Sequence, residues 1–204
     1  MPRAATATTS PRRMTLEEWG NLDDDIEGEL VDGLLEEEEV ATFLHEIVVA
    51  WLTSTLRTWV RPRHGYVAVS EAKIVVGERR GRKPDVSVYL RGKLPALTDT
   101  LVRTPPHVVV EVLSPRPRDA RRDRVDKIAD YAAAGIRYYW LLDPELRTLE
   151  VFERDARGRY RLAVARGEGR INIPGCRGLV LNLDELWAEV DEAERRDQAQ
   201  RRKR

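Results

Sequence analysis

The chain has 204 residues, and its 35 Lys and Arg balance its 35 Asp and Glu. This length suits one globular domain, and the single cysteine, Cys176, excludes a disulfide-rich secreted scaffold. No apolar run approaches the roughly 20 residues of a membrane-spanning helix. Residues 1–13 lack the apolar segment of a secretory signal. We therefore expect a cytoplasmic protein without a membrane span, beginning with a disordered leader over residues 1–13.

Charge is distributed unevenly along the chain. No Lys or Arg occurs from Met14 to Leu44, whereas basic residues gather at 79–83, 116–124 and 201–204. The neutral total gives no argument for a nucleic-acid partner. Two of the basic clusters nevertheless flank the acidic motifs described below, where they would attract a phosphate backbone. The alternative is that the basic clusters are solvated faces, and we favour it for the terminal one.

The first half of the chain shows helical and strand periodicity in turn. Asp32-Gly33 between apolar residues indicates a hairpin, and apolar residues spaced by three and four predict a long helix that Pro62 ends. The predicted elements are a short helix capped by Thr15, a hairpin within 26–35, a helix over 41–60, strands over 65–76 and 85–90, and a charged turn over 77–82.

The second half predicts a strand, a helix and then further strands. The valine-rich run at 107–113 is typical of a strand buried on both faces, and Gly135 can end the helix that follows. The predicted elements are strands over 107–113 and 136–142 around a helix over 119–134, a hairpin of strands 148–153 and 159–165, a strand over 169–173, and a helix from 185 to about 193 capped by Asp184.

This element order predicts an α/β (α+β) fold in which helices flank a mixed β-sheet. Residues 107–142 form a candidate right-handed crossover between parallel strands. We expect one domain over residues 14–190, followed by a charged tail over 191–204 that is helical or disordered.

Two acidic residues on predicted strands carry most of the functional argument. Asp85 follows Pro84 at the start of one strand, and Glu111 follows three valines in another. A carboxylate inside an apolar strand is costly unless it has a partner. Two that converge would repel each other and favour a hard cation such as Mg²⁺. Lys127, on the next helix, could hold or activate a water. Two carboxylates, a cation and such a lysine are the groups that metal-dependent phosphodiester hydrolysis uses.

Each of these residues also has a structural interpretation. Asp85 could be a strand-end acid in a turn, and Glu111 could pair with a downstream arginine. Lys127 could be an exposed helical lysine paired with Asp123, four residues earlier, which contributes only tenths of a kcal/mol. For Asp85 and Glu111 we favour the functional interpretation, and for Lys127 the two are balanced.

Other polar and aromatic residues were weighed in the same way. His45 and His64 could act as general bases near neutral pH, but we favour a core or capping role for His45. Residues 36–39 are four successive acids that point in different directions and cannot converge on one ion. Residues 138–140 could stack on bases, although packing is the favoured interpretation, and Cys176 has no predicted role.

Three motifs together resemble a known family. They are PD at 84–85, PPHVVVEVLSP at 105–115 and RDRVDKIADYAAAGIRYYWLLDP at 122–144. The chain resembles the Uma2 family of bacterial nucleases over about residues 14–190, and the segment 29–33 and His45 are similar to its N-terminal half. The resemblance implies the PD-(D/E)XK fold, which is restriction-endonuclease-like.

The resemblance also implies roles for individual residues. Asp85 would be the metal-binding aspartate of the first half-motif, and Glu111 the acid of the second. The lysine usual in this fold stands two residues after that acid, where this chain has Leu113. The resemblance therefore implies that the lysine role has moved to the following helix, with Lys127 as the candidate.

A further metal ligand is expected from the N-terminal part, with Glu29 as first candidate and Glu46 as second. The resulting prediction is a Mg²⁺- or Mn²⁺-dependent DNA endonuclease. The alternative is an inactive nucleic-acid- or protein-binding module on the same fold, which Leu113 and the neutral net charge keep open. A homodimer is possible because two cuts in a duplex need two sites.

Overall fold

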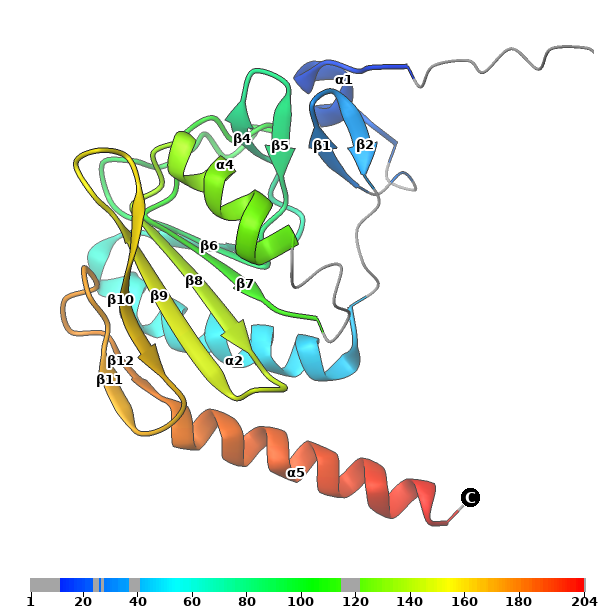
Figure 1. Cartoon of the computed structure of the whole chain (residues 1–204), viewed down its shortest axis with the longest axis vertical. Helices are drawn as coiled ribbons and strands as arrows, with labels where there is room; N and C mark the ends of the chain where they lie inside the picture. The colour runs from blue at the N-terminus through cyan, green and yellow to red at the C-terminus, as the bar shows by residue number, and fades with distance from the viewer. Residues whose placement is uncertain (1–11, 24–25, 27, 37–40, 115–121, 204) are drawn as a thin grey trace, which may run out of the picture.

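A six-stranded sheet forms the centre of the molecule (Figure 1). The computed structural model describes residues 12–23, 26, 28–36, 41–114 and 122–203. The strand order is β10-β9-β8-β7-β6-β3, in which only the β7–β8 pair is parallel. The strands are β3 (Tyr66–Val69), β6 (Val86–Tyr89), β7 (Val108–Val112), β8 (Tyr138–Asp143), β9 (Thr148–Arg154) and β10 (Tyr160–Arg166).

Helices cover both faces of this sheet (Figure 1). Helices α2 (Phe43–Val60) and α5 (Leu183–Arg201) pack on one face, where they share an apolar core with β6 to β9. A π-helical segment, η2 (Arg122–Lys127), continues into α4 (Ile128–Ala133), which packs on the other face. The expected mixed sheet flanked by helices is confirmed.

The pleat of β7 decides which way its acid points. Val108, Val110 and Val112 lie in the α2 and α5 core, whereas Val109 and Leu113 lie in the core beside α4. Because successive side chains of a strand alternate between faces, Glu111 points toward the α4 side. Leu113 is buried in that core, which explains why this position holds an apolar residue.

A smaller sheet lies against α4. Its strand order is β2-β1-β5-β4. The short helix α1 (Leu16–Gly20) packs on this sheet, and its Trp19 shares a small apolar cluster with Leu30 of the sheet. The predicted Asp32-Gly33 turn joins β1 to β2, with positive φ at both residues, as a tight hairpin requires. The strands are β1 (Glu29–Val31), β2 (Leu34–Glu36), β4 (Ile74–Gly77) and β5 (Arg80–Arg82).

The region from 65 to 82 differs from its prediction. The expected strand over 65–76 is two strands in different sheets, because the chain turns at Ser70, where φ is positive. The expected charged turn over 77–82 contains strand β5, which pairs with β1 and β4. Its arginines can occupy a strand because acidic side chains from other elements bind them.

Two helices also differ from their predictions. The helix expected from 119 is described from Arg122, where it is π-helical before becoming α-helical at Ile128, and its predicted start lies outside the described residues. The last helix starts at Leu183 after Asn182 rather than after Asp184, whose carboxylate accepts from the Gly169 backbone.

The last helix is also longer than expected and continues through most of the predicted tail to Arg201. Glu192–Arg196 and Asp197–Arg201 ion pairs, spaced by four, support this exposed part.

Most of the remaining elements agree with the sequence pattern. Gly135 has positive φ after α4, and the β9–β10 hairpin is present. The predicted strand β11 (Arg170–Asn172) forms a small ladder with β12 (Val180–Asn182), which was not predicted. The 3-10 helix η1 (Arg61–Arg63), also not predicted, follows α2. No helix in the described ranges is long and apolar enough to span a membrane. The expected leader falls almost entirely on residues 1–11, outside the described ones.

Candidate active site

A small polar cavity of about 90 Å³ lies where β1, α2, β6, β7 and η2 meet. Charged side chains from segments distant in sequence line most of it. The lining residues are Glu29, Ala41, His45, Lys83, Asp85, Glu111, Val112, Ser114, Arg122, Asp123 and Lys127.

Asp85 is held rigidly at the start of β6. Its Oδ2 accepts a 2.7 Å hydrogen bond from the Val112 backbone N–H, next to Glu111 on β7. Its Oδ1 lies 3.2 Å from His45 Nε2, which α2 supplies. Burial lowers the pKa of His45, but the hydrogen bond that Asp85 accepts, the charge of Asp85 and the neighbouring Glu46 together outweigh it and raise the pKa. The aspartate is therefore fixed by a strand on one side and a helix on the other.

Glu111 is buried at the cavity floor. Its Oε1 accepts a 2.5 Å hydrogen bond from Tyr131 Oη and lies 3.1 Å from Lys127 Nζ. Burial raises the pKa of Glu111 well above its ordinary value; Lys127 opposes this rise, whereas Asp123 and Asp85 add to it. Burial, together with the neighbouring acids, thus outweighs the effect of Lys127 on the pKa of Glu111.

Lys127 is buried among carboxylates rather than exposed. Its Nζ lies 3.1 Å from Asp123 Oδ1, 3.1 Å from Glu111 Oε1 and 3.5 Å from Glu29 Oε1. Burial lowers the pKa of Lys127, but these carboxylates outweigh it and raise the pKa well above its ordinary value. Lys127 is therefore a fixed positive charge at neutral pH.

Glu29 on β1 is buried and firmly bound. Its Oε2 accepts from Arg82 Nη1 at 2.7 Å, and its Oε1 accepts from the Lys83 backbone at 2.9 Å. Burial raises the pKa of Glu29, but Lys127 and Arg82 outweigh it and lower the pKa. Glu29 is thus an ionised carboxylate at the cavity wall, and both of its oxygens already have partners.

The structure brings the four predicted site residues to one cavity. They are Asp85, Glu111, Lys127 and Glu29. Glu46, the second candidate ligand, is outside the lining and its carboxylate lies 3.3 Å from His45 Nδ1.

The residues that we assigned to structure lie elsewhere. The side chains of residues 138–140 are buried in the two cores, which confirms packing as their role. Cys176 is buried in the core beneath α2 and α5, and His64 is exposed at the far end of α2.

Three neighbours of Asp85, Glu111 and Lys127 were underrated from sequence, namely His45, Asp123 and Tyr131. His45 faces Asp85, although we favoured a core or capping role for it. Asp123, Lys127 and Tyr131 are spaced by four and all reach the cavity or its floor. That spacing was a visible signal for one helix face, whereas nothing local in the sequence indicated which element His45 would face.

The carboxylates of the cavity are oxygen donors, which is the ligand type that a hard divalent cation takes. Among the described residues, no three His, Cys, Asp or Glu side chains are arranged to hold a metal by themselves. Mg²⁺, however, is commonly bound through one or two carboxylates plus water and substrate phosphate. Asp85 and Glu111 supply carboxylate oxygens, and a cation bound there would oppose the burial and the neighbouring acids that raise the pKa of Glu111.

Comparison with known families identifies the family of the chain. The model of the Uma2 family, described as "Putative restriction endonuclease", matches residues 15–184. The chain belongs to the Uma2 family. No curated protein matches it.

One solved structure shares the fold of the Uma2 chain. A structure described as a "putative nuclease belonging to DUF820", from Anabaena variabilis ATCC 29413, superposes with a TM-score of 0.72 at 19% identity. The match covers 87% of this chain and 99% of that one, and at this identity it shows the fold alone. The type IIG restriction endonuclease BpuSI matches at a TM-score of 0.35 and 14% identity, over 63% of this chain and 14% of its own.

Proposed function

We propose that this protein is a Mg²⁺- or Mn²⁺-dependent endonuclease that hydrolyses phosphodiester bonds in DNA. The observation that supports this most is the convergence of Asp85, Glu111 and Lys127 on one cavity. The three come from two strands and a helix and lie in a buried, polar setting. Membership of a family described as restriction endonucleases agrees with the same chemistry.

In this proposal Asp85 and Glu111 hold the cation. When bound, it would polarise the scissile phosphate and lower the pKa of the attacking water. Asp85 is held for this role by the Val112 N–H and by His45, and Glu111 by Tyr131. Glu29 remains a candidate third ligand, and in the present arrangement its oxygens bind Arg82 and Lys83.

Lys127 acts as a positive charge rather than as a base. Its pKa is raised by the surrounding carboxylates, so the ammonium keeps its proton at neutral pH. From this position it can orient a water or stabilise the negative charge that develops on the phosphate, the kind of preorganised electrostatic contribution that dominates many enzymes.

Nicking of supercoiled plasmid in Mg²⁺ and Mn²⁺ tests the proposal. Asp85→Asn and Glu111→Gln keep an amide oxygen that can accept the hydrogen bonds from Val112 N and Tyr131 Oη. We expect both variants to fold and to lose nicking, and Lys127→Gln to lose roughly 100- to 1000-fold, the magnitude of one removed electrostatic donor.

The matched control is Glu153→Gln. It neutralises a carboxylate on β9 that binds Arg137 and lies away from the cavity. It should nick like the wild type. Full metal-dependent cleavage by either Asp85→Asn or Glu111→Gln would show that the assignment is wrong.

One observation favours a second candidate, a non-catalytic binding module. Lys127 already contacts three carboxylates of the cavity, as a stabilising ion network without a metal would. For such a module, purified wild-type protein takes up no Mg²⁺ or Mn²⁺ and does not nick DNA, and neutralising Asp85 leaves partner binding unchanged.

A further inference from the structure

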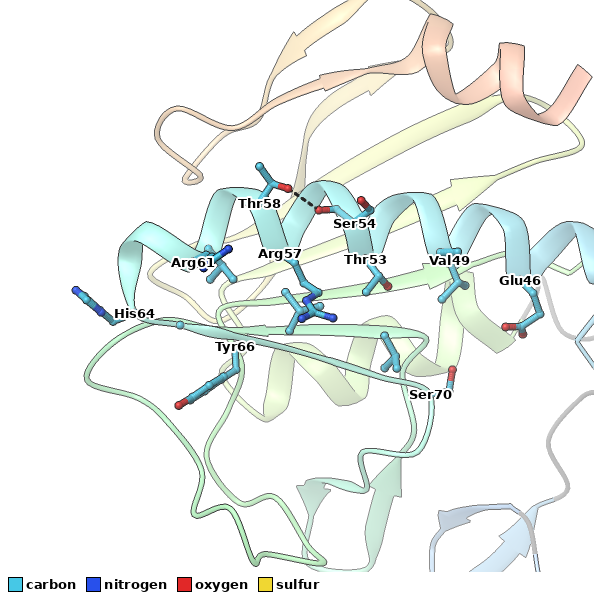
Figure 2. A pocket seen from close by; sticks show the side chains of 15 residues that line it. Glu46, Val49, Thr53, Ser54, Arg57, Thr58, Arg61, His64, Tyr66 and Ser70 are labelled. Carbon is cyan, nitrogen blue, oxygen red and sulfur yellow. Dashed lines mark hydrogen bonds between the residues drawn. The ribbon is translucent and has the colours of Figure 1, made fainter. Parts of the chain in front are cut away.

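A second, larger hollow follows the outer side of α2. It has a volume of about 1290 Å³ and lies between this helix and β3, the edge strand of the central sheet. Figure 2 shows Glu46 and Ser70 at one end of it and Arg61, His64 and Tyr66 toward the other. From Glu46 to Arg61 the helix rises about 22 Å at 1.5 Å per residue. We call this hollow the α2–β3 groove.

One end of the α2–β3 groove adjoins the candidate active site. Glu46 contacts His45, whose other ring nitrogen lies 3.2 Å from Asp85. Ser70 lies on the opposite wall and donates its backbone N–H to the Asp85 carbonyl at 3.1 Å. A chain molecule lying in the groove would therefore reach the Asp85 side of the cavity at this end.

The groove becomes more positively charged with distance from the end that adjoins the candidate active site. Arg57 and Arg61 are one helical turn apart, and His64 follows, all three exposed. Within the described ranges, neither arginine makes a side-chain hydrogen bond or ion pair. By contrast, Arg80, Arg124 and Arg147 each bind a carboxylate. Glu46 is the one acid among the described residues that line the groove.

The exposed arginines of the groove suit a nucleic-acid strand. Arginine side chains that lack a carboxylate partner bind phosphates, and this binding weakens as salt rises. The Thr58 hydroxyl donates to the Ser54 carbonyl within α2. The exposed ring of Tyr66 points away from α2, toward the face of the sheet that holds Tyr89. Charge, rather than base stacking, therefore indicates what the groove binds.

We propose that one strand of the DNA substrate lies in the α2–β3 groove. Its phosphates contact Arg57 and Arg61, and the strand continues past Ser70 to the cavity. This inference rests on the proposed nuclease function, because it takes the groove as the approach to that cavity. It assigns substrate binding to residues outside the acidic site.

Fluorescence anisotropy with a labelled single-stranded DNA oligonucleotide tests the groove. Binding is measured on the full chain in EDTA, where no cleavage occurs, across a series of salt concentrations. Arg57→Gln/Arg61→Gln should weaken binding roughly 10- to 100-fold at 50 mM salt and make the slope of log affinity against log salt shallower by about 1.4, since each single-strand phosphate contact contributes about 0.7. Gln preserves helix propensity.

The control variant is Arg157→Gln/Arg159→Gln. It removes the same charge from two exposed arginines in the β9–β10 hairpin, at the opposite edge of the central sheet from β3. It should keep wild-type affinity and slope. The same titrations with duplex DNA show whether any loss extends to the single strand.

Two results would overturn the groove proposal. One is wild-type affinity and slope in the groove variant, and the other is a loss confined to duplex DNA. Plasmid nicking distinguishes a failure of the groove proposal from a failure of the proposed nuclease function. Nicking by wild type with unaltered binding in the groove variant contradicts only the groove, whereas groove-dependent binding without any nicking contradicts only the hydrolysis.

Discussion

At the scale of single residues, the hydroxyl of Tyr131 orients the carboxylate of Glu111. It donates the 2.5 Å hydrogen bond to Glu111 Oε1 from a fully buried position. Groups that orient a metal ligand in this way usually contribute 10- to 100-fold to metal affinity or activity. Tyr131 is therefore a positioning residue in this account, and Glu111 is the ligand.

Tyr131→Phe should reduce nicking and Mg²⁺ affinity 10- to 100-fold, because Glu111 loses its fixed orientation. Tyr139→Phe is the matched control, since its hydroxyl donates to the Asp123 carbonyl instead. Both variants should lose about 1–3 kcal/mol in urea unfolding. Equal nicking by the two variants would mean that Tyr131 only stabilises the fold.

Cys176 gives a pH-dependent prediction away from the site. Burial raises the pKa of this thiol from 9.0 to about 12. The unfolded thiol ionises first as pH rises, so this contribution to the free energy of unfolding is complete below pH 9 and is lost toward pH 12. A thiol reagent at pH 8 should label Cys176 only after urea unfolding. Rapid, stoichiometric labelling of the native protein would contradict its burial.

At the scale of elements, β5 ties the small sheet to α4. Arg82 lies fully buried in this strand, with Nη1 2.7 Å from Glu29 Oε2 and Nη2 2.6 Å from Asp130 Oδ2. Arg80 reaches the same Asp130 from the more exposed side of the strand. The ion network therefore sets the position of β1 relative to the helix that carries Lys127.

Arg82→Met should lower the free energy of unfolding by about 3–5 kcal/mol, because it leaves Glu29 and Asp130 buried without their partner. Arg80→Met is the control and should lose no more than about 1 kcal/mol, since its pairs are partly solvated. Urea denaturation measures both values. Equal losses would show that the buried position of Arg82 has no special importance.

At the scale of the whole molecule, the sequence predicted the elements that have strong periodicity. The valine run of β7, the apolar face of α2 and the β9–β10 hairpin lie where expected. Strand β5 was missed because its arginines look like a solvated turn, and only Glu29 and Asp130, about 50 residues away on each side, neutralise Arg82.

The candidate site shows the same limit. Asp85 and Glu111 stood out because a carboxylate in an apolar strand needs a reason. For Lys127 the functional and structural interpretations stayed balanced, since its partners Glu29 and Glu111 come from other elements. The pairing of His45 with Asp85 depends on how α2 crosses the sheet. No local pattern in the sequence predicts that orientation.

Isothermal titration of Mg²⁺ and Mn²⁺ into the purified protein tests the central claim most directly. The account predicts saturable binding to the wild type and to Glu153→Gln, and loss of that binding in the Asp85→Asn/Glu111→Gln double variant while its thermal unfolding remains cooperative. Equal binding by the double variant, or none by the wild type, would contradict a metal site built on these two carboxylates.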